Sequence, residues 1–292
     1  MTGFWIPHLT DDGSFTFFSE EFGETFHSQL GAKQEAFLKF AAATNLAEQA
    51  KRDQIRLLDV CYGLGYNTAA ALETIWAMNP YCRVEVYGLE LDESVPKAAV
   101  EPPLIDSWSA TVRGVLRSLA SDHQCEMPYL SATLLIGDAR QTIQQLQGFR
   151  ADAIFFDPFS PRRCPQLWTV EFFQAVAGCL AASGKLATYS RSASVRAALR
   201  AAGLQIGTIP LNGDGAHLPH EWSQGTVAGF EAQALTPLSI MEQEHLQTRA
   251  AIPYHDPTLT DSAEAILERH QLQQQQAHCE STSSWRRRWG IR

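Results

Sequence analysis

The segment from residue 56 to residue 68 reads Arg56-Leu57-Leu58-Asp59-Val60-Cys61-Tyr62-Gly63-Leu64-Gly65-Tyr66-Asn67-Thr68. An apolar, strand-like run ends here in a glycine turn and continues directly into an Ala- and Leu-rich helix. Gly63 and Gly65 allow the backbone to approach a ligand closely and to adopt angles that other residues resist. The helix that follows begins with N–H groups that have no partner within the helix. The segment therefore predicts a turn that binds a nucleotide-like cofactor.

Two later strand-like runs each end in an acidic residue. Residues 84–90 end at Glu90, which is well placed to accept both hydroxyls of a ribose. Residues 133–139 contain Asp138, which could hold an adenine amino group. A dinucleotide-binding fingerprint would carry its third glycine at position 68, and Thr68 stands there, so the pyrophosphate pattern is incomplete.

This succession of glycine turn, ribose acid and base-side acid resembles the class I S-adenosylmethionine methyltransferases. The resemblance implies S-adenosylmethionine as the cofactor. The alternative is a Rossmann-like domain whose acids are ordinary strand-end residues, because fold and function are separable. The predicted cofactor-binding residues are Asp59, Tyr62, Gly63, Gly65, Asn67, Glu90, Asp138 and Ala139.

Composition limits the protein classes that the chain can belong to. Its 292 residues can bury a large core, and its net charge of −9 argues against a general nucleic-acid coat while allowing a local basic patch. Six cysteines stand singly without CxxC or Cys/His ligand spacing, so we expect no metal site. The N-terminus lacks the pattern of a signal peptide, and no apolar run reaches the length of a membrane span. A reducing cytoplasm is the simplest predicted location.

The alternation of strands and helices predicts an α/β fold with a doubly wound, mostly parallel sheet. We expect an N-terminal hairpin and helix cap over 1–50, a methyltransferase domain over 51–232 and a partly flexible C-terminal extension over 233–292. Within the cap, 32–49 reads as one amphipathic helix. The last two strands of the domain predict an antiparallel edge hairpin. Other predicted elements are strands at 153–157, 185–189, 204–209 and 226–230 and helices at 107–119, 169–182, 193–202 and 261–275.

The loop after the fourth predicted strand reads Asp157-Pro158-Phe159-Ser160-Pro161. It stands at the carboxyl end of a parallel strand, where ligands bind in open α/β sheets, and its two prolines stiffen it. An Asp followed by Pro-Phe is similar to the loops with which amino-group methyltransferases hold an amine. A carboxylate can bind an ammonium group and take up its proton, and the transfer needs in-line positioning. The alternative is that Asp157 only caps the loop.

Longer motifs resemble the methyltransferase domain of the MnmC family. The members of this family are bifunctional enzymes that modify the wobble uridine of tRNA. These motifs lie at 19–36, at the cofactor turn 61–67, at 156–169 and at 186–203. The resemblance implies N-methylation of 5-aminomethyl-2-thiouridine in the tRNA anticodon region, with Asp157 orienting the amine and Phe159 and Trp168 walling the pocket. It also implies a stand-alone methyltransferase form, with a separate oxidase to supply the amine.

One departure from the family pattern affects the predicted tRNA contact. The family carries a basic pair after the sixth strand, whereas residues 212–223 contain no Lys or Arg. Arg162 and Arg163, beside the catalytic loop, are therefore the better candidates for phosphate contact, with a solvated charge pair as the alternative. The basic and aromatic tail at 285–289 is typical of a solvated end, and RNA contact is its less favoured interpretation.

Two other functions stay open at the level of the sequence. An aminopropyltransferase of the spermidine-synthase kind would share the sheet, the ribose acid and an Asp loop that binds an amine. A noncatalytic RNA-binding module with a degenerate methyltransferase fold would explain the missing basic loop. The mass of the product distinguishes the first from a methyltransferase, and binding of the cofactor distinguishes the second.

Overall fold

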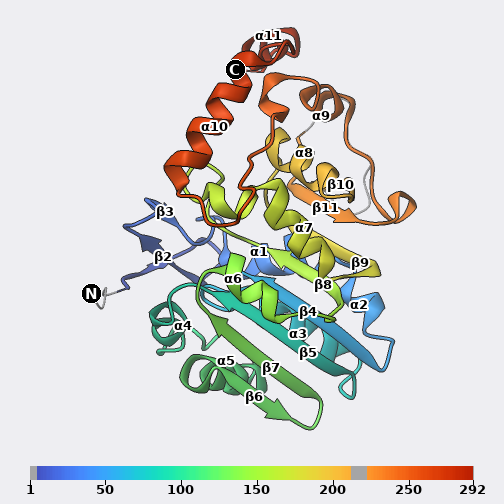
Figure 1. Cartoon of the computed structure of the whole chain (residues 1–292). Helices are drawn as coiled ribbons and strands as arrows, with labels where there is room; N and C mark the ends of the chain where they lie inside the picture. The colour runs from blue at the N-terminus through green and yellow to red at the C-terminus, as the bar shows by residue number, and fades with distance from the viewer. Residues whose placement is uncertain (1–4, 212–221, 292) are drawn as a thin grey trace. The chain divides into compact units, whose positions relative to one another are not determined.

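The computed structural model describes residues 5–211 and 222–291 (Figure 1). The chain divides into two compact units, residues 1–159 and 160–292. The first unit contains the cofactor turn and the loop that begins at Asp157. The second contains Trp168 and the C-terminal extension.

The first unit is built on a mostly parallel sheet with the strand order β8-β4-β5-β7-β6. Four strands run parallel: β4 (Gln54–Val60), β5 (Arg83–Glu90), β7 (Leu130–Ile136) and β8 (Ala151–Phe156). A short strand that the sequence did not predict, β6 (Gln124–Met127), pairs antiparallel with β7. The buried positions of the central strands are mostly apolar because both faces of such a sheet are covered. The predicted class of α/β fold is confirmed.

Helices follow the strands of the first unit in the expected alternation. They are α3 (Tyr66–Met78), α4 (Ser94–Ala99), α5 (Ala110–Asp122), α6 (Ala139–Thr142) and the 3₁₀ turn η2 (Ile143–Gln145). The Ser109 side chain caps α5 by accepting a hydrogen bond from the backbone of Val112. Because β4, β5 and β7 run parallel, the residues that follow them share one edge of the sheet, which is where the predicted cofactor residues lie.

The N-terminal segment forms a small antiparallel sheet and an interrupted helix. The sheet consists of β1 (Pro7–Leu9), β2 (Phe15–Ser19) and β3 (Glu24–Thr25). The single helix expected over 32–49 is wrong, since this region is divided into α1 (Ala32–Glu35), a π-helical segment η1 (Ala36–Ala42) and α2 (Leu46–Gln49). The break lies at Asn45, whose φ of 59° is left-handed and cannot continue a helix.

The second unit contains three antiparallel strands in the order β10-β11-β9, including the expected edge hairpin. These are β9 (Leu180–Thr188), β10 (Gln205–Ile209) and β11 (Gly225–Gly229). The helices are η3 (Pro165–Trp168), α7 (Val170–Gly178) and α8 (Ala193–Ala201). The helix predicted over 169–182 is too long, because β9 begins at Leu180. Sheet formation here overrides the helix propensity of Ala181 and Ala182.

The C-terminal extension folds into short helices: η4 (Ala232–Ala234), α9 (Ile240–His245), η5 (Arg249–Ala251), α10 (Ala263–Gln276) and α11 (Thr282–Arg288). The expectation of a solvated tail is wrong for Trp285, whereas Arg286, Arg287 and Arg288 are exposed. Trp285 is fully buried and stacks on His245 with ring centroids 4.3 Å apart. Arg288 pairs with Glu244 and Glu280. Among the helices that the structure describes, none is long and apolar enough to cross a membrane.

Candidate active site

The cofactor turn depends on its two glycines for steric reasons. Gly63 and Gly65 have φ values of 55° and 79°, in the left-handed region that other residues rarely adopt. A Cβ atom at Gly65 would lie 2.6 Å from the hydroxyl oxygen of Tyr62, and one at Gly63 would lie 3.2 Å from the ring of Phe26. The turn is therefore closely packed on both sides. The buried Tyr62 is a packing partner of the turn, at 4% exposure.

Glu90 fixes this turn from the end of the neighbouring strand. Its Oε2 accepts a hydrogen bond of 2.7 Å from the backbone N–H of Gly63, and its Oε1 accepts one of 2.9 Å from Asp92. Burial raises the pKa of the Glu90 carboxyl, and these backbone donors oppose the rise. A carboxylate can accept about four hydrogen bonds, so Glu90 keeps acceptor capacity for a ligand.

Two buried oxygens at the turn have no hydrogen-bond partner among the described residues. They are Oδ1 of Asp59 and Oδ1 of Asn67. The other oxygen of Asp59 accepts a 2.7 Å hydrogen bond from the hydroxyl of Thr68. Burial raises the pKa of Asp59 well above its ordinary value, and the charges of Asp157 and Glu90 raise it further. A buried acceptor left unsatisfied is costly, so a donor from a ligand would stabilise this site.

Asp157 lies beside this turn at the end of β8. Its backbone N–H donates to the carbonyl of Val60 (3.1 Å), and its Oδ2 accepts a hydrogen bond of 2.9 Å from the side-chain amide of Asn67. Burial raises the pKa of Asp157 to about 7, and the carboxylate of Glu35 adds to the rise. Asn67 and Lys39 act in the opposite direction. The carboxyl group is therefore half ionised near neutral pH.

Glu35 and Lys39 belong to the N-terminal segment, and sequence reasoning assigned them no role. Glu35 accepts a hydrogen bond of 3.1 Å from the backbone of Ser28 and forms an ion pair with Lys39. Both side chains are largely buried, at 13% and 23% exposure. A lone Glu and Lys one helical turn apart look like a surface pair in sequence. Only the similarity of residues 19–36 to the MnmC family marked the segment.

Phe159 is held by two aromatic rings from the same N-terminal segment. Phe22 stacks on it with ring centroids 4.5 Å apart and an interplanar angle of 18°. Phe26 meets it edge-on at 4.9 Å. Since Phe26 also lies against Gly63, it links the cofactor turn to the loop that carries Asp157. Sequence reasoning missed both rings.

The remaining predicted residues lie in different environments. Asp138 caps α6 through the backbone of Arg140 and forms an ion pair with its guanidinium at 2.7 Å, so it shares its oxygens with a partner that was not predicted. Ala139 is the first residue of that helix. Trp168 is fully buried in the second unit, with its ring 6.0 Å from that of Tyr189.

The two arginines proposed for phosphate contact, Arg162 and Arg163, are both exposed in the second unit. The loop expected to carry the family's basic pair, 212–221, lies outside the described residues. In the ranges that the structure describes, no group of three or more His, Cys, Asp or Glu side chains could hold a metal ion.

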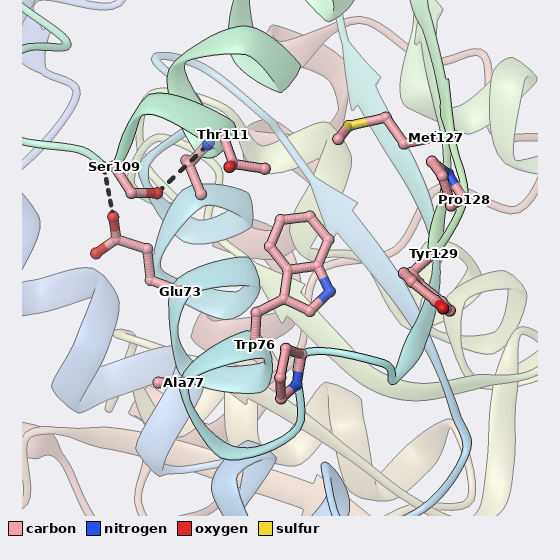
Figure 2. A pocket seen from close by; sticks show the side chains of 10 residues that line it. Glu73, Trp76, Ala77, Ser109, Thr111, Met127, Pro128 and Tyr129 are labelled. Carbon is pink, nitrogen blue, oxygen red and sulfur yellow. Dashed lines mark hydrogen bonds between the residues drawn. The ribbon is translucent and has the colours of Figure 1, made fainter.

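A hollow of about 550 Å³ lies between α3, the start of α5 and the turn from β6 to β7 (Figure 2). The indole of Trp76 stands in its middle, between Glu73 on one side and Met127 and Tyr129 on the other. Ser109 closes one end by donating its backbone N–H to Glu73 at 2.7 Å. None of the predicted site residues lines this hollow.

The residues at the cofactor turn fit S-adenosylmethionine. Asp59, Glu90 and Asp157 all have raised pKa values, so a ligand with positive charge would stabilise their ionised forms. S-adenosylmethionine carries a sulfonium and an α-ammonium group. The ammonium also offers N–H donors of the kind that the buried oxygens of Asp59 and Asn67 lack.

Comparisons with known proteins agree with the class of fold and with the predicted family. A family model for S-adenosyl-L-methionine-dependent methyltransferases matches residues 102–216. The crystal structure of MnmC2 from Aquifex aeolicus superposes with a TM-score of 0.80 and 31% sequence identity, covering 94% of this chain and 86% of that one. An uncharacterized protein of Methanocaldococcus jannaschii is 26% identical over 89% of this chain and 69% of its own length.

A bifunctional relative matches over part of its length. The tRNA 5-methylaminomethyl-2-thiouridine biosynthesis bifunctional protein MnmC of Polaromonas naphthalenivorans is 30% identical over 218 residues, which are 70% of this chain. The match covers 33% of that protein, so the chain spans about one third of the length of its bifunctional relative.

The fold and the matching family model define an S-adenosylmethionine-dependent methyltransferase of class I. The resemblance inferred from the motifs is confirmed at the level of the family. The chain belongs to the MnmC2 family, because it is 31% identical to the Aquifex protein over most of both chains.

Proposed function

We propose that this methyltransferase transfers a methyl group to the 5-aminomethyl group of a wobble uridine in tRNA, which gives the 5-methylaminomethyl derivative. The names of the bifunctional relatives describe biosynthesis of this nucleoside, which supports the substrate. We further propose that a separate oxidase supplies the amine.

The observation that carries the proposal is the hydrogen bond of 2.9 Å from Asn67 to Asp157. It ties the one carboxylate of the Pro-stiffened loop to the first turn of α3, directly after the glycines that would hold the cofactor. When bound, the cofactor would supply an electrophilic methyl group on a positively charged sulfur. Asp157 then binds the substrate ammonium and orients the nitrogen.

The raised pKa of Asp157 suits removal of a proton from this ammonium. An aliphatic ammonium has a reference pKa of about 10.4. Moving its proton to a carboxylate with a pKa of about 7 is uphill by about 5 kcal/mol, whereas the ordinary Asp value of 3.8 would make it about 9 kcal/mol. The nitrogen would form its bond to the methyl group as the carbon–sulfur bond breaks, with the electron pair of that bond left on sulfur. The product leaves as a secondary ammonium, and the one proton lost in the reaction passes from Asp157 to solvent.

Phe159 and the rings behind it wall the place where the amine binds. Phe22 and Phe26 fix the ring of Phe159, so its orientation does not depend on the loop alone. An apolar wall beside Asp157 strengthens the interaction of the carboxylate with an ammonium by excluding water. The assignment of Trp168 to this pocket stays a prediction from the family resemblance.

The test is incubation of the chain with methyl-labelled cofactor and tRNA that lacks the final methyl group, followed by mass analysis of the nucleosides. We expect one added methyl on the aminomethyl nitrogen. Addition of an aminopropyl group would instead identify an aminopropyltransferase. Absence of any cofactor binding by calorimetry would identify a noncatalytic module.

The role of Asp157 is tested separately with Asp157→Asn. This change keeps the shape of the side chain but removes the proton acceptor, so turnover should fall at least about 100-fold. Cofactor affinity should change little. Asp122→Asn, at the exposed end of α5, is the matched control and should keep full activity. Full turnover by Asp157→Asn would refute the assigned role.

A further inference from the structure

Arg191 is an exposed arginine held in one orientation by two contacts within the second unit. It follows β9 and precedes α8, in a loop between a strand and a helix. Its Nη1 donates a hydrogen bond of 3.2 Å to the backbone carbonyl of Ser223. Its guanidinium carbon lies over the ring of Trp222, 5.3 Å from the centroid. An exposed arginine without such contacts would sample many rotamers.

Trp222, the residue whose ring contacts the guanidinium of Arg191, packs against two further aromatic rings. Trp222 meets the ring of His245 edge-on at 5.4 Å and that of Trp285 at 5.8 Å. His245 and Trp285 stack on each other, and Trp285 is fully buried. The C-terminal extension, through α9 and α11, therefore supplies a rigid aromatic base for the guanidinium.

The carbonyl that accepts from Arg191 is fixed by a buried ionic network. Ser223 is fully buried, and both its backbone N–H (3.1 Å) and its hydroxyl (2.6 Å) donate to Oε1 of Glu242. Glu242 forms a buried ion pair with Arg196 at 3.1 Å and completes the capping box of α9 with Ser239. The position of the Ser223 backbone is thus determined by several charge-assisted bonds.

These contacts leave most of the donors of Arg191 available. A guanidinium has five N–H groups in a planar fork, and one of them is used by Ser223. No carboxylate of the described ranges 5–211 and 222–291 forms an ion pair with Arg191. Its charge is therefore not neutralised within the part of the chain that the structure describes.

We propose that Arg191, with Trp222 as its support, is a binding site for a backbone phosphate of the tRNA substrate. The proposal rests on the proposed function, since it assumes tRNA as the substrate. A planar, oriented guanidinium matches the geometry of a phosphate. Because the side chain is already held in one orientation, binding a phosphate costs little side-chain entropy. The loop at the carboxyl end of a strand is also where this class of fold places ligand contacts. The chain has a net charge of −9, so most of its surface repels the tRNA backbone, whereas the charge of Arg191 attracts it locally.

The experiment measures binding of tRNA to the full chain at several salt concentrations, by anisotropy of labelled tRNA. Loss of one phosphate contact in Arg191→Ala should reduce the slope of log affinity against log salt by roughly 0.7 to 0.9. At about 0.15 M salt this weakens binding about four- to sixfold. Arg200→Ala, which removes another exposed arginine near the end of α8, is the matched control and should keep both values.

A second variant tests the support of the guanidinium. Trp222→Leu keeps the charge of Arg191 but removes the ring beneath it, so binding of tRNA should weaken without loss of the arginine. Thermal melting checks that each variant is folded. Wild-type affinity of Trp222→Leu would overturn the role of the ring.

The two levels of the proposal fail in different ways. If the wild-type chain neither binds nor methylates tRNA, the proposed function is wrong and the phosphate site falls with it. If the wild-type chain methylates tRNA while Arg191→Ala matches Arg200→Ala in affinity and salt slope, only the phosphate site is wrong.

Discussion

Glu35 and Lys39 provide a pair of variants that should move the pH dependence of methyl transfer in opposite directions. The charge of Glu35 raises the pKa of Asp157, and the charge of Lys39 lowers it. Glu35→Gln removes the like charge and also leaves Lys39 without its ion-pair partner, so the pKa of Asp157 falls. Lys39→Met removes the favourable charge and leaves Glu35 unscreened, so the pKa rises.

The direction of the pH dependence follows from the ionisation state in which Asp157 accepts the proton. The ionised carboxylate accepts the proton, so activity is present above its pKa and is lost as the pH falls through about 7. Asp59 also faces Asp157, and its own pKa is raised. Because neither variant touches Asp59 or the hydrogen bond from Asn67, those contributions stay constant across the series.

The expected magnitude is about one pKa unit for each variant, at the low end of shifts caused by neighbouring charges. For Glu35→Gln the pKa of Asp157 would fall from about 7 to roughly 6. The ionised fraction at about pH 6 then rises from about one tenth to about one half, and kcat/KM at that pH rises about fivefold. For Lys39→Met the pKa of Asp157 would rise by about one unit, so kcat/KM at about pH 7 falls about fivefold.

The assay is the pH profile of kcat/KM for methyl transfer to tRNA, measured for the wild type, both single variants and the double variant. The double variant Glu35→Gln/Lys39→Met removes both charges and should return close to the wild-type profile. If both single variants shift the acidic limb in the same direction, or neither shifts it, the electrostatic account of Asp157 is refuted.

Two further changes test the packing of the site, and a third tests a helix outside it. Phe22→Ala removes the stack on Phe159, worth about 1 kcal/mol, and should lower kcat/KM for tRNA about fivefold with cofactor affinity unchanged by calorimetry. Gly65→Ala forces a side chain into a left-handed residue and against Tyr62, so it should cost about 1–3 kcal/mol of stability in denaturant and abolish cofactor binding. Gly114→Ala, in a helix where a Cβ meets nothing within 4 Å, should instead stabilise the chain by up to about 1 kcal/mol in the same titration.

The sequence predicts the parallel strands well because their signal is local. A buried parallel strand is a short apolar run, and β8 has this pattern without interruption from Ala153 to Phe156. The errors lie where tertiary contacts override local preference. Asn45 breaks a pattern that reads as one helix, and β9 begins within a run that favours a helix. Trp285 is buried by His245, forty residues away in the sequence, so no local pattern could predict its burial.

The candidate site divides in the same way. Gly63, Glu90 and Asp157 follow strand ends, and the topology of a parallel sheet brings strand ends together, so their proximity could be predicted. Glu35 could not be placed, because it reaches Asp157 from a segment that precedes the sheet and obeys no rule of sheet topology. Motif similarity marked that segment without indicating which side chain faces the site.

The acidic groups of this site are costly to the folded chain and so point to the ligand. Asp157 has its pKa raised from 3.8 to about 7, so at any pH above 7 its carboxylate destabilises the folded chain by about 4 kcal/mol, a cost relieved as the pH falls from 7 towards 3.8. Asp59 and Glu90 are shifted in the same direction. A chain selected for stability alone would replace such residues with neutral ones. The positive groups of the cofactor would offset this cost at Asp59 and Glu90, and the substrate ammonium would offset it at Asp157, the group that then receives the proton.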